Sequence, residues 1–101
     1  MNINTPMSSE ANFSTKDITL AATLNTLLFK ISGIKYQYEG TRPKPVGYFE
    51  FPNSENLQKA ITGFLRGELA VEPRSFMMHL RALKAEVSNI YKNPDSPLQP
   101  K

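Results

Sequence analysis

Basic side chains of this chain could bind another molecule, and they fall into two groups. One group recurs on a side of a helix expected from Pro73 to about Lys92, and the other lies in a turn-rich loop. These candidate nucleic-acid contacts are Arg74, Arg81, Lys84 and Lys92 on the helix, and Arg42 and Lys44 in the loop. Such cations bind phosphates with a salt-dependent, sequence-tolerant affinity. For both groups the alternative is an ordinary solvated surface, and Glu86 interrupts the helical one.

Aromatic side chains provide a second candidate surface. Two expected strands, residues 34–39 and 46–51, carry tyrosines that could share an exposed face and contact a protein or stack on bases. These candidate protein-interface residues are Tyr36, Tyr38 and Tyr48. Alternation along the second strand places Phe49 and Phe51 on the opposite face from Tyr48, and we expect both phenylalanines in the core.

No arrangement of residues indicates catalysis. On its helix the single histidine, His79, has Ser75 and Leu83 four residues away, and neither offers a carboxylate to orient the ring. We therefore expect His79 to be structural. The chain lacks cysteine, so it has no disulfide and no thiolate metal site, and one histidine cannot make a familiar zinc site. The sequence predicts no enzyme activity, no cofactor and no metal.

Size and composition limit the classes of protein that fit. The chain has 101 residues, of which 40% are hydrophobic, enough for one domain with a small core and modest stability. The net charge of +3 permits nucleic-acid binding without requiring it. No stretch approaches the ~18 apolar residues of a membrane span, so we expect no membrane partner. The absence of cysteine fits a cytoplasmic protein, and the small core leaves room for a homo-oligomer.

The hydrophobic pattern predicts one α+β domain in residues 13–92, with the order α-β-β-α-α. Residues 1–12 are expected to form a disordered arm and residues 93–101 a flexible tail. The two strands are expected to form an antiparallel hairpin that packs on the helices.

The first helix is predicted to begin at a capping box with Ser14 as N-cap and Asp17 at N3, although Thr15 could be the cap instead. It is predicted to continue through Ile31 and to end at Gly33.

Capping residues also predict where the other two helices begin and end. The second is predicted to have Asn53 or Ser54 as its N-cap and to end at Gly67, after which residues 68–71 form a connector that could add a short strand. Pro73 suits the first position of the last helix. The apolar seam of that helix is Phe76, Leu80, Leu83, Val87 and Ile90.

Several of these segments resemble segments of a known family. They are Ser14-Thr15-Lys16-Asp17, Leu20-Ala21-Ala22, Tyr48-Phe49-Glu50-Phe51, Phe64-Leu65-Arg66-Gly67, Val71-Glu72-Pro73, Phe76 and Leu80-Arg81-Ala82-Leu83-Lys84. In them the chain resembles a family of short bacterial and phage proteins known only as a domain of unknown function. The resemblance covers nearly the whole expected domain and implies a fold and a phage or mobile-element setting. It implies no catalytic residues.

These observations lead to three hypotheses. The first is a non-enzymatic accessory binding module of a phage or mobile element that acts as a protein-protein adaptor through the tyrosines. The alternative is a nucleic-acid-binding accessory protein that uses the basic helix and the hairpin loop, and the third is a small enzyme of unknown reaction. Tyrosines and cations on opposite faces favour the adaptor, whereas one continuous surface of both favours single-stranded nucleic acid.

Overall fold

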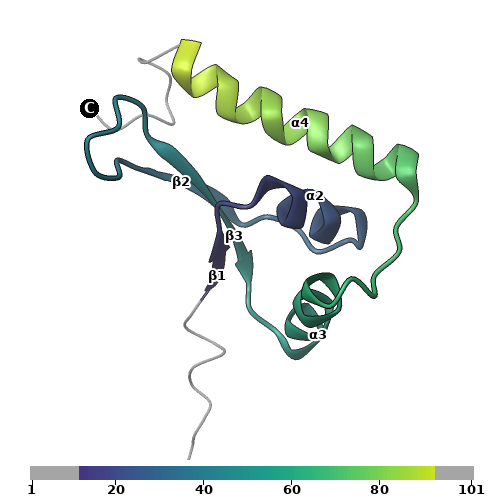
Figure 1. Ribbon diagram of the computed structural model, residues 1–101. Helices are drawn as coiled ribbons and strands as arrows, with labels where there is room; N and C mark the ends of the chain where they lie inside the picture. Colours follow the sequence, from purple (N-terminus) through teal and green to yellow (C-terminus); the bar gives the residue numbers. More distant parts are fainter. Residues whose placement is uncertain (1–11, 93–101) are drawn as a thin grey trace, which may run out of the picture.

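Strand β3 lies at the centre of a three-stranded antiparallel sheet, between β1 and β2. The computed structural model describes residues 12–92, and for residues 90–92 only the backbone. In chain order the elements are β1 (Asn12–Thr15), α2 (Ile18–Thr26), β2 (Gly33–Gln37), β3 (Val46–Pro52), α3 (Glu55–Leu65) and α4 (Pro73–Lys92). The predicted α+β class and antiparallel hairpin are confirmed, and one strand precedes the first of these helices (Figure 1).

The register of the strands separates the two faces of the sheet. Phe13 of β1 lies opposite Phe51 of β3, and Ile34 of β2 lies opposite Phe49 of β3. These four side chains share one face, since paired residues point to the same side of a sheet. They belong to the core, together with side chains of the helices. Phe49 is 2% exposed and Phe51 is 0% exposed, which confirms the prediction that both are core residues.

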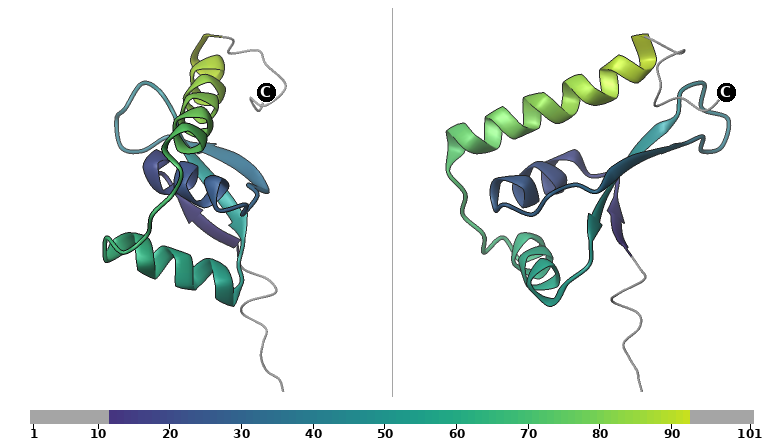
Figure 2. Two further views of the ribbon diagram at one scale, coloured as in Figure 1. Left: turned by 90° about the vertical axis from the view of Figure 1, so that its right-hand side faces the viewer. Right: turned by 180° about the vertical axis from the view of Figure 1, so that it is seen from behind.

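Helix α2 is the central helix, because it contributes to the core beside the sheet and also packs against α4 (Figures 1 and 2). Its buried residues are Leu20, Ala21, Ala22, Thr23 and Leu24. From the other side Leu83 of α4 is buried, and Phe76, Leu80 and Val87 pack against the core while partly exposed. The predicted apolar seam of α4 is therefore confirmed through Val87, and the side chain of Ile90 lies outside the described residues.

The beginning of α2 differs from the prediction. Residues 12–15 are strand, so Ser14 is not a helix cap, and α2 begins at Ile18 with Asp17 as its N-cap. Asp17 Oδ1 accepts hydrogen bonds from the backbone N–H groups of Thr19 and Leu20, at 2.9 Å and 3.2 Å. β1 forms because it pairs with β3 and brings Phe13 into the core. Residues 1–11 of the predicted arm, and the predicted tail of residues 93–101, lie outside the described residues.

The end of α2 also differs, because the helix stops at Thr26 and Gly33 belongs to β2. The chain leaves the helix in a Schellman motif. The N–H of Phe29 donates to the carbonyl of Leu24 at 2.9 Å, and the N–H of Leu28 donates to that of Asn25 at 2.9 Å. Leu28 takes the left-handed conformation of this motif, with φ of 77°, where glycine is the usual residue. The helix end was missed because its left-handed residue is a leucine.

The other helix ends agree with the prediction. Ser54 is the N-cap of α3, and its hydroxyl accepts from the N–H of Leu57 at 3.1 Å. Gly67 ends α3 in a second Schellman motif, with φ of 70°. α4 begins at Pro73 as predicted. The connector between α3 and α4 contains no strand. β3 begins at Val46 as predicted, and the other three limits of the hairpin strands differ by one or two residues from the prediction.

The two Schellman motifs provide a test of the strain at Leu28. The side chain of Leu28 is 85% exposed, so its removal costs little burial. We expect Leu28→Gly to increase the free energy of unfolding by about 0.5–1 kcal/mol, because glycine adopts positive φ without steric cost. Chemical denaturation measures this change.

The matched controls are Leu28→Ala, which keeps the strain, and Gly67→Ala, which creates it. Leu28→Ala should change the stability by less than about 0.5 kcal/mol, and Gly67→Ala should lower it by about 1 kcal/mol. A loss of stability in Leu28→Gly equal to that in Gly67→Ala would contradict this explanation of the end of α2.

Candidate functional site

The solvent-facing side of α4 combines cations with exposed methionines. Arg74, Met77, Met78 and Arg81 follow each other at helical spacing and, with Pro73, line an open hollow of about 530 Å³. We call these four residues the Arg-Met surface. Met77 is 42% exposed and Met78 is 64% exposed, so two large apolar side chains lie in water between two guanidinium groups. Within the described part of the chain neither arginine forms an ion pair.

Packing and capping together determine which side of α4 carries this surface. The seam of Phe76, Leu80 and Leu83 is held against the core, and the Arg-Met surface lies on the other side of the same turns. The first turn is fixed by Glu72, whose carboxylate accepts from the N–H groups of Arg74 and Ser75 at 3.1 Å and 2.7 Å. These backbone hydrogen bonds, that of Ser75 first, lower the pKa of Glu72 below its ordinary value.

His79 joins α4 to the end of α2. Its Nδ1 atom lies 2.8 Å from the carbonyl oxygen of Ser75 and 3.3 Å from Oγ1 of Thr26. The Thr26 hydroxyl lies 2.7 Å from the carbonyl oxygen of Ala22, to which it donates. Nδ1 is therefore assigned as an N–H donor shared by Ser75 and Thr26. These contacts agree with the expected structural role of His79.

The loop cations line a second surface, at the other end of α4. Arg42 and Lys44 surround an open pocket of about 420 Å³ together with Lys16, which follows β1. Its apolar lining includes Ile18 of α2 and Val87 of α4. We call this the loop pocket. The hairpin loop lies toward the end of α4, far from Pro73 (Figures 1 and 2). Of the cations predicted from sequence, Arg74 and Arg81 therefore belong to one site and Arg42 and Lys44 to another.

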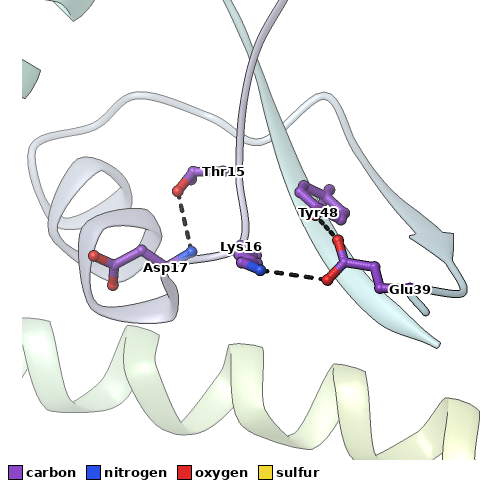
Figure 3. A network of polar contacts seen from close by, with 5 residues as sticks. All are labelled: Thr15, Lys16, Asp17, Glu39 and Tyr48. Atoms are coloured by element: carbon purple, nitrogen blue, oxygen red, sulfur yellow. Dashed lines mark hydrogen bonds and ion pairs between the residues drawn. The ribbon is translucent and has the colours of Figure 1, made fainter. Parts of the chain in front are cut away.

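Lys16 was missed as a site residue because β1 was not recognised as a strand. If the pairing of β1 with β3 is continued by one residue, Lys16 falls beside Tyr48. Its ammonium group lies 3.3 Å from Glu39 Oε1, and the Tyr48 hydroxyl donates to Glu39 Oε2 (Figure 3). In the sequence Lys16 is simply a polar residue before the Asp17 cap. Nothing in this position indicates that its side chain lies near Tyr48.

This network shifts two pKa values. The hydrogen bond from Tyr48 is the largest cause that lowers the pKa of Glu39, and Lys16 lowers it further. The same hydrogen bond raises the pKa of Tyr48, because it stabilises the protonated phenol beside a carboxylate. Both residues are accessible to solvent, so the network orients side chains on the outer face of the hairpin and adds little stability.

The expected shared face of the three tyrosines is corrected by the strand register. Tyr36 lies opposite Gly47, on the same face as Ile34 and Phe49, whereas Tyr48 lies opposite Lys35 on the other face. A Cβ atom at Gly47 would lie 3.2 Å from Cε1 of Tyr36, so the absent side chain makes room for this ring. The third tyrosine, Tyr38, follows β2 and is 65% exposed. The tyrosines do not form one surface.

The remaining candidates add no catalytic centre. Lys84 is exposed, and the side chain of Lys92 lies outside the described residues. In residues 12–92 no three histidine or acidic side chains are placed to hold a metal ion. No helix within this range has the length and apolarity to cross a membrane. Comparison of the chain with family models, curated proteins and solved structures gave no match.

A measurement of the pKa of Glu39 tests the network of Lys16, Glu39 and Tyr48. We expect Tyr48→Phe to raise this pKa toward its ordinary value, because the strongest hydrogen bond to the carboxylate is removed. The lowered pKa in the wild type means that Glu39 stabilises the fold above its unfolded-state pKa, and that this contribution is lost as pH falls through the folded-state pKa. Titration of the side-chain carboxyl carbon by NMR measures the shift.

Tyr38→Phe is the matched control, because it also removes a phenol from the hairpin and should leave the Glu39 titration unchanged. An unchanged Glu39 pKa in Tyr48→Phe, or an equal change in the control, would show that the Tyr48 hydrogen bond does not hold this carboxylate.

Proposed function

We propose that the protein is a non-enzymatic accessory binding module that acts in the cytoplasm as a protein-protein adaptor. The Arg-Met surface of α4 is the contact that we assign to the partner. The phage or mobile-element setting is part of the proposal and follows from the family resemblance. The adaptor class is the one inferred from sequence, with its contact moved from the tyrosines to the outer side of α4.

The observation that carries the proposal is the exposure of Met77 and Met78 between Arg74 and Arg81. Methionine and arginine are both enriched in protein interfaces. An unbranched thioether adapts to differently shaped apolar groups, which suits a docking surface. The flanking guanidinium groups select for carboxylates, because each can bind one through two hydrogen bonds. A partner helix with an apolar strip between acidic residues matches this surface.

Nucleic acid remains the second candidate, supported by the exposed side chains of Arg74, Arg81 and Lys84 on α4. Two observations favour the adaptor. Phosphates would leave the two exposed methionines uncovered, and Tyr36 and Tyr48 lie on opposite faces of the sheet, so they form no single stacking platform for bases. Near the loop cations, the Tyr48 hydroxyl is already hydrogen-bonded to Glu39, whose negative charge opposes phosphate binding.

The test uses two probes, an amphipathic helical peptide with a leucine strip flanked by glutamates and a single-stranded oligonucleotide. If the protein is an adaptor, the peptide should bind. The double change Met77→Ala with Met78→Ala should weaken peptide binding about tenfold, because the apolar contact is lost. Arg74→Glu with Arg81→Glu should weaken it at least about tenfold and reduce its salt dependence. Fluorescence anisotropy at two salt concentrations measures both effects.

The charge-matched control is Lys30→Glu with Lys59→Glu, two exposed lysines outside α4. It carries the same change in net charge and should keep most of the peptide affinity. Oligonucleotide binding that is reduced by the arginine change and unaffected by the methionine change, without peptide binding, would support the nucleic-acid alternative and contradict the adaptor.

A further inference from the structure

The Arg-Met surface contains every sulfur atom in the described part of the chain. The sequence has four methionines and no cysteine, and Met77 and Met78 are the two methionines that the structure describes. Their side chains are 42% and 64% exposed, so solutes in water reach both thioethers directly. Because no thiol competes, an oxidant that attacks sulfur reacts with methionine in this protein, and on α4 it reacts at the proposed contact itself.

Neither of these methionines belongs to the core. Phe76, Leu80 and Leu83 are the side chains through which the first half of α4 packs on the core, and the two methionines are not among them. A polar group added at an exposed position costs little stability, whereas one added in a core is buried without a partner. A chemical change at the two sulfur atoms therefore alters the surface while the domain stays folded.

Two guanidinium groups lie within helical reach of each methionine. Met77 follows Arg74 by three residues and precedes Arg81 by four. Met78 follows Arg74 by four residues and precedes Arg81 by three. Residues at these spacings are neighbours on a helix surface, and all four line the same hollow. No residue of α4 before Glu86 is acidic, and within the described residues neither arginine forms an ion pair, so both can donate to a new acceptor.

Oxidation of a thioether by hydrogen peroxide creates such an acceptor. A sulfur lone pair forms the S–O bond as the O–O bond breaks, the proton on the transferred oxygen passes to the departing hydroxide, and water leaves. Sulfur loses two electrons and the peroxide gains them. The product is a polar sulfoxide, whereas the thioether is only a weak acceptor, and a guanidinium group only donates. The neighbouring arginines therefore provide the donors that each new oxygen requires.

We propose that Met77 and Met78 form a peroxide-sensitive switch of the Arg-Met surface. Oxidation of both to sulfoxides releases the partner in two ways. It replaces the apolar contact with polar oxygens, and it engages Arg74 and Arg81, which are the donors for the carboxylates of the partner. A methionine sulfoxide reductase restores the thioethers, with a dithiol oxidised to a disulfide and the oxygen released as water. This inference rests on the proposed function, since the contact must exist before it can be released.

The experiment compares the full chain before and after treatment with hydrogen peroxide, with the peroxide removed before binding is measured. Mass spectrometry determines the sulfoxide at each methionine, and fluorescence anisotropy measures the affinity for the acidic amphipathic peptide, which contains no sulfur. Oxidation of Met77 and Met78 should weaken peptide binding at least about tenfold. The melting temperature should change by no more than about 4 °C, and treatment with the reductase and a dithiol should restore the affinity.

Two variants separate these methionines from Met1 and Met7, which peroxide also reaches in the sequence. Met77→Leu with Met78→Leu removes both thioethers of the surface. Whatever the affinity of this variant before treatment, peroxide should leave it unchanged. Met7→Leu keeps both thioethers of the surface and should lose as much affinity on oxidation as the unaltered chain.

The arginine side chains provide a readout that does not depend on the peptide. Oxidation should shift the NMR signals of the Nε–H groups of Arg74 and Arg81, because these groups gain an acceptor. Arg66, an exposed residue at the end of α3, is the control and should keep its signal.

Failure of the switch and failure of the adaptor give different results. Untreated protein that does not bind the peptide would contradict the proposed function and the switch together. Untreated and oxidised proteins that bind it equally well would overturn the switch alone. An equal loss in the double leucine variant, a loss accompanied by unfolding, or a loss without shifts at Arg74 and Arg81 would also overturn it.

Discussion

Burial of α2 against the sheet, α3 and α4 is the constraint on which the rest of the structure depends. Ala21, Ala22 and Leu24 are 0% exposed, so α2 contributes its apolar side chains both beside Phe49 and Phe51 and toward α4. α4 must turn its seam toward α2, and its remaining side chains then face solvent. The Arg-Met surface is a consequence of this packing, since Arg74, Met77, Met78 and Arg81 are what the sequence provides on the outer side of those turns.

Much of this fold follows from periodicity and capping. The seam of α4, the hairpin, the core phenylalanines and the cap at Ser54 could be predicted, because each combines a hydrophobic period with a local signal. β1 could not be predicted, because a four-residue strand is too short to show a hydrophobic period and forms through its pairing with β3. The early end of α2 could not be predicted either, because the exposed Leu28 takes the left-handed conformation in which glycine is the usual residue.

For the candidate sites, the sequence could predict which cations are available but not how they are grouped in space. Sequence placed Arg74, Arg81 and Lys84 on the solvent side of one helix, which the structure confirms. It could not tell how far these cations lie from Arg42 and Lys44 in space, since that distance depends on how the hairpin packs beside α4. It also grouped three tyrosines that the strand register divides, because the pairing of Tyr36 with Gly47 is set by contacts between strands.

In the proposed function the two sides of α4 have different tasks, the seam in folding and the Arg-Met surface in partner binding. Methyl NMR of the methionines during titration with the acidic amphipathic peptide tests it most directly. We expect saturable shifts at the methyl groups of Met77 and Met78, while the methyl signals of Leu83 and Val87 keep their positions. Shifts concentrated at Leu83 and Val87, or saturation without any change at the two methionines, would contradict it.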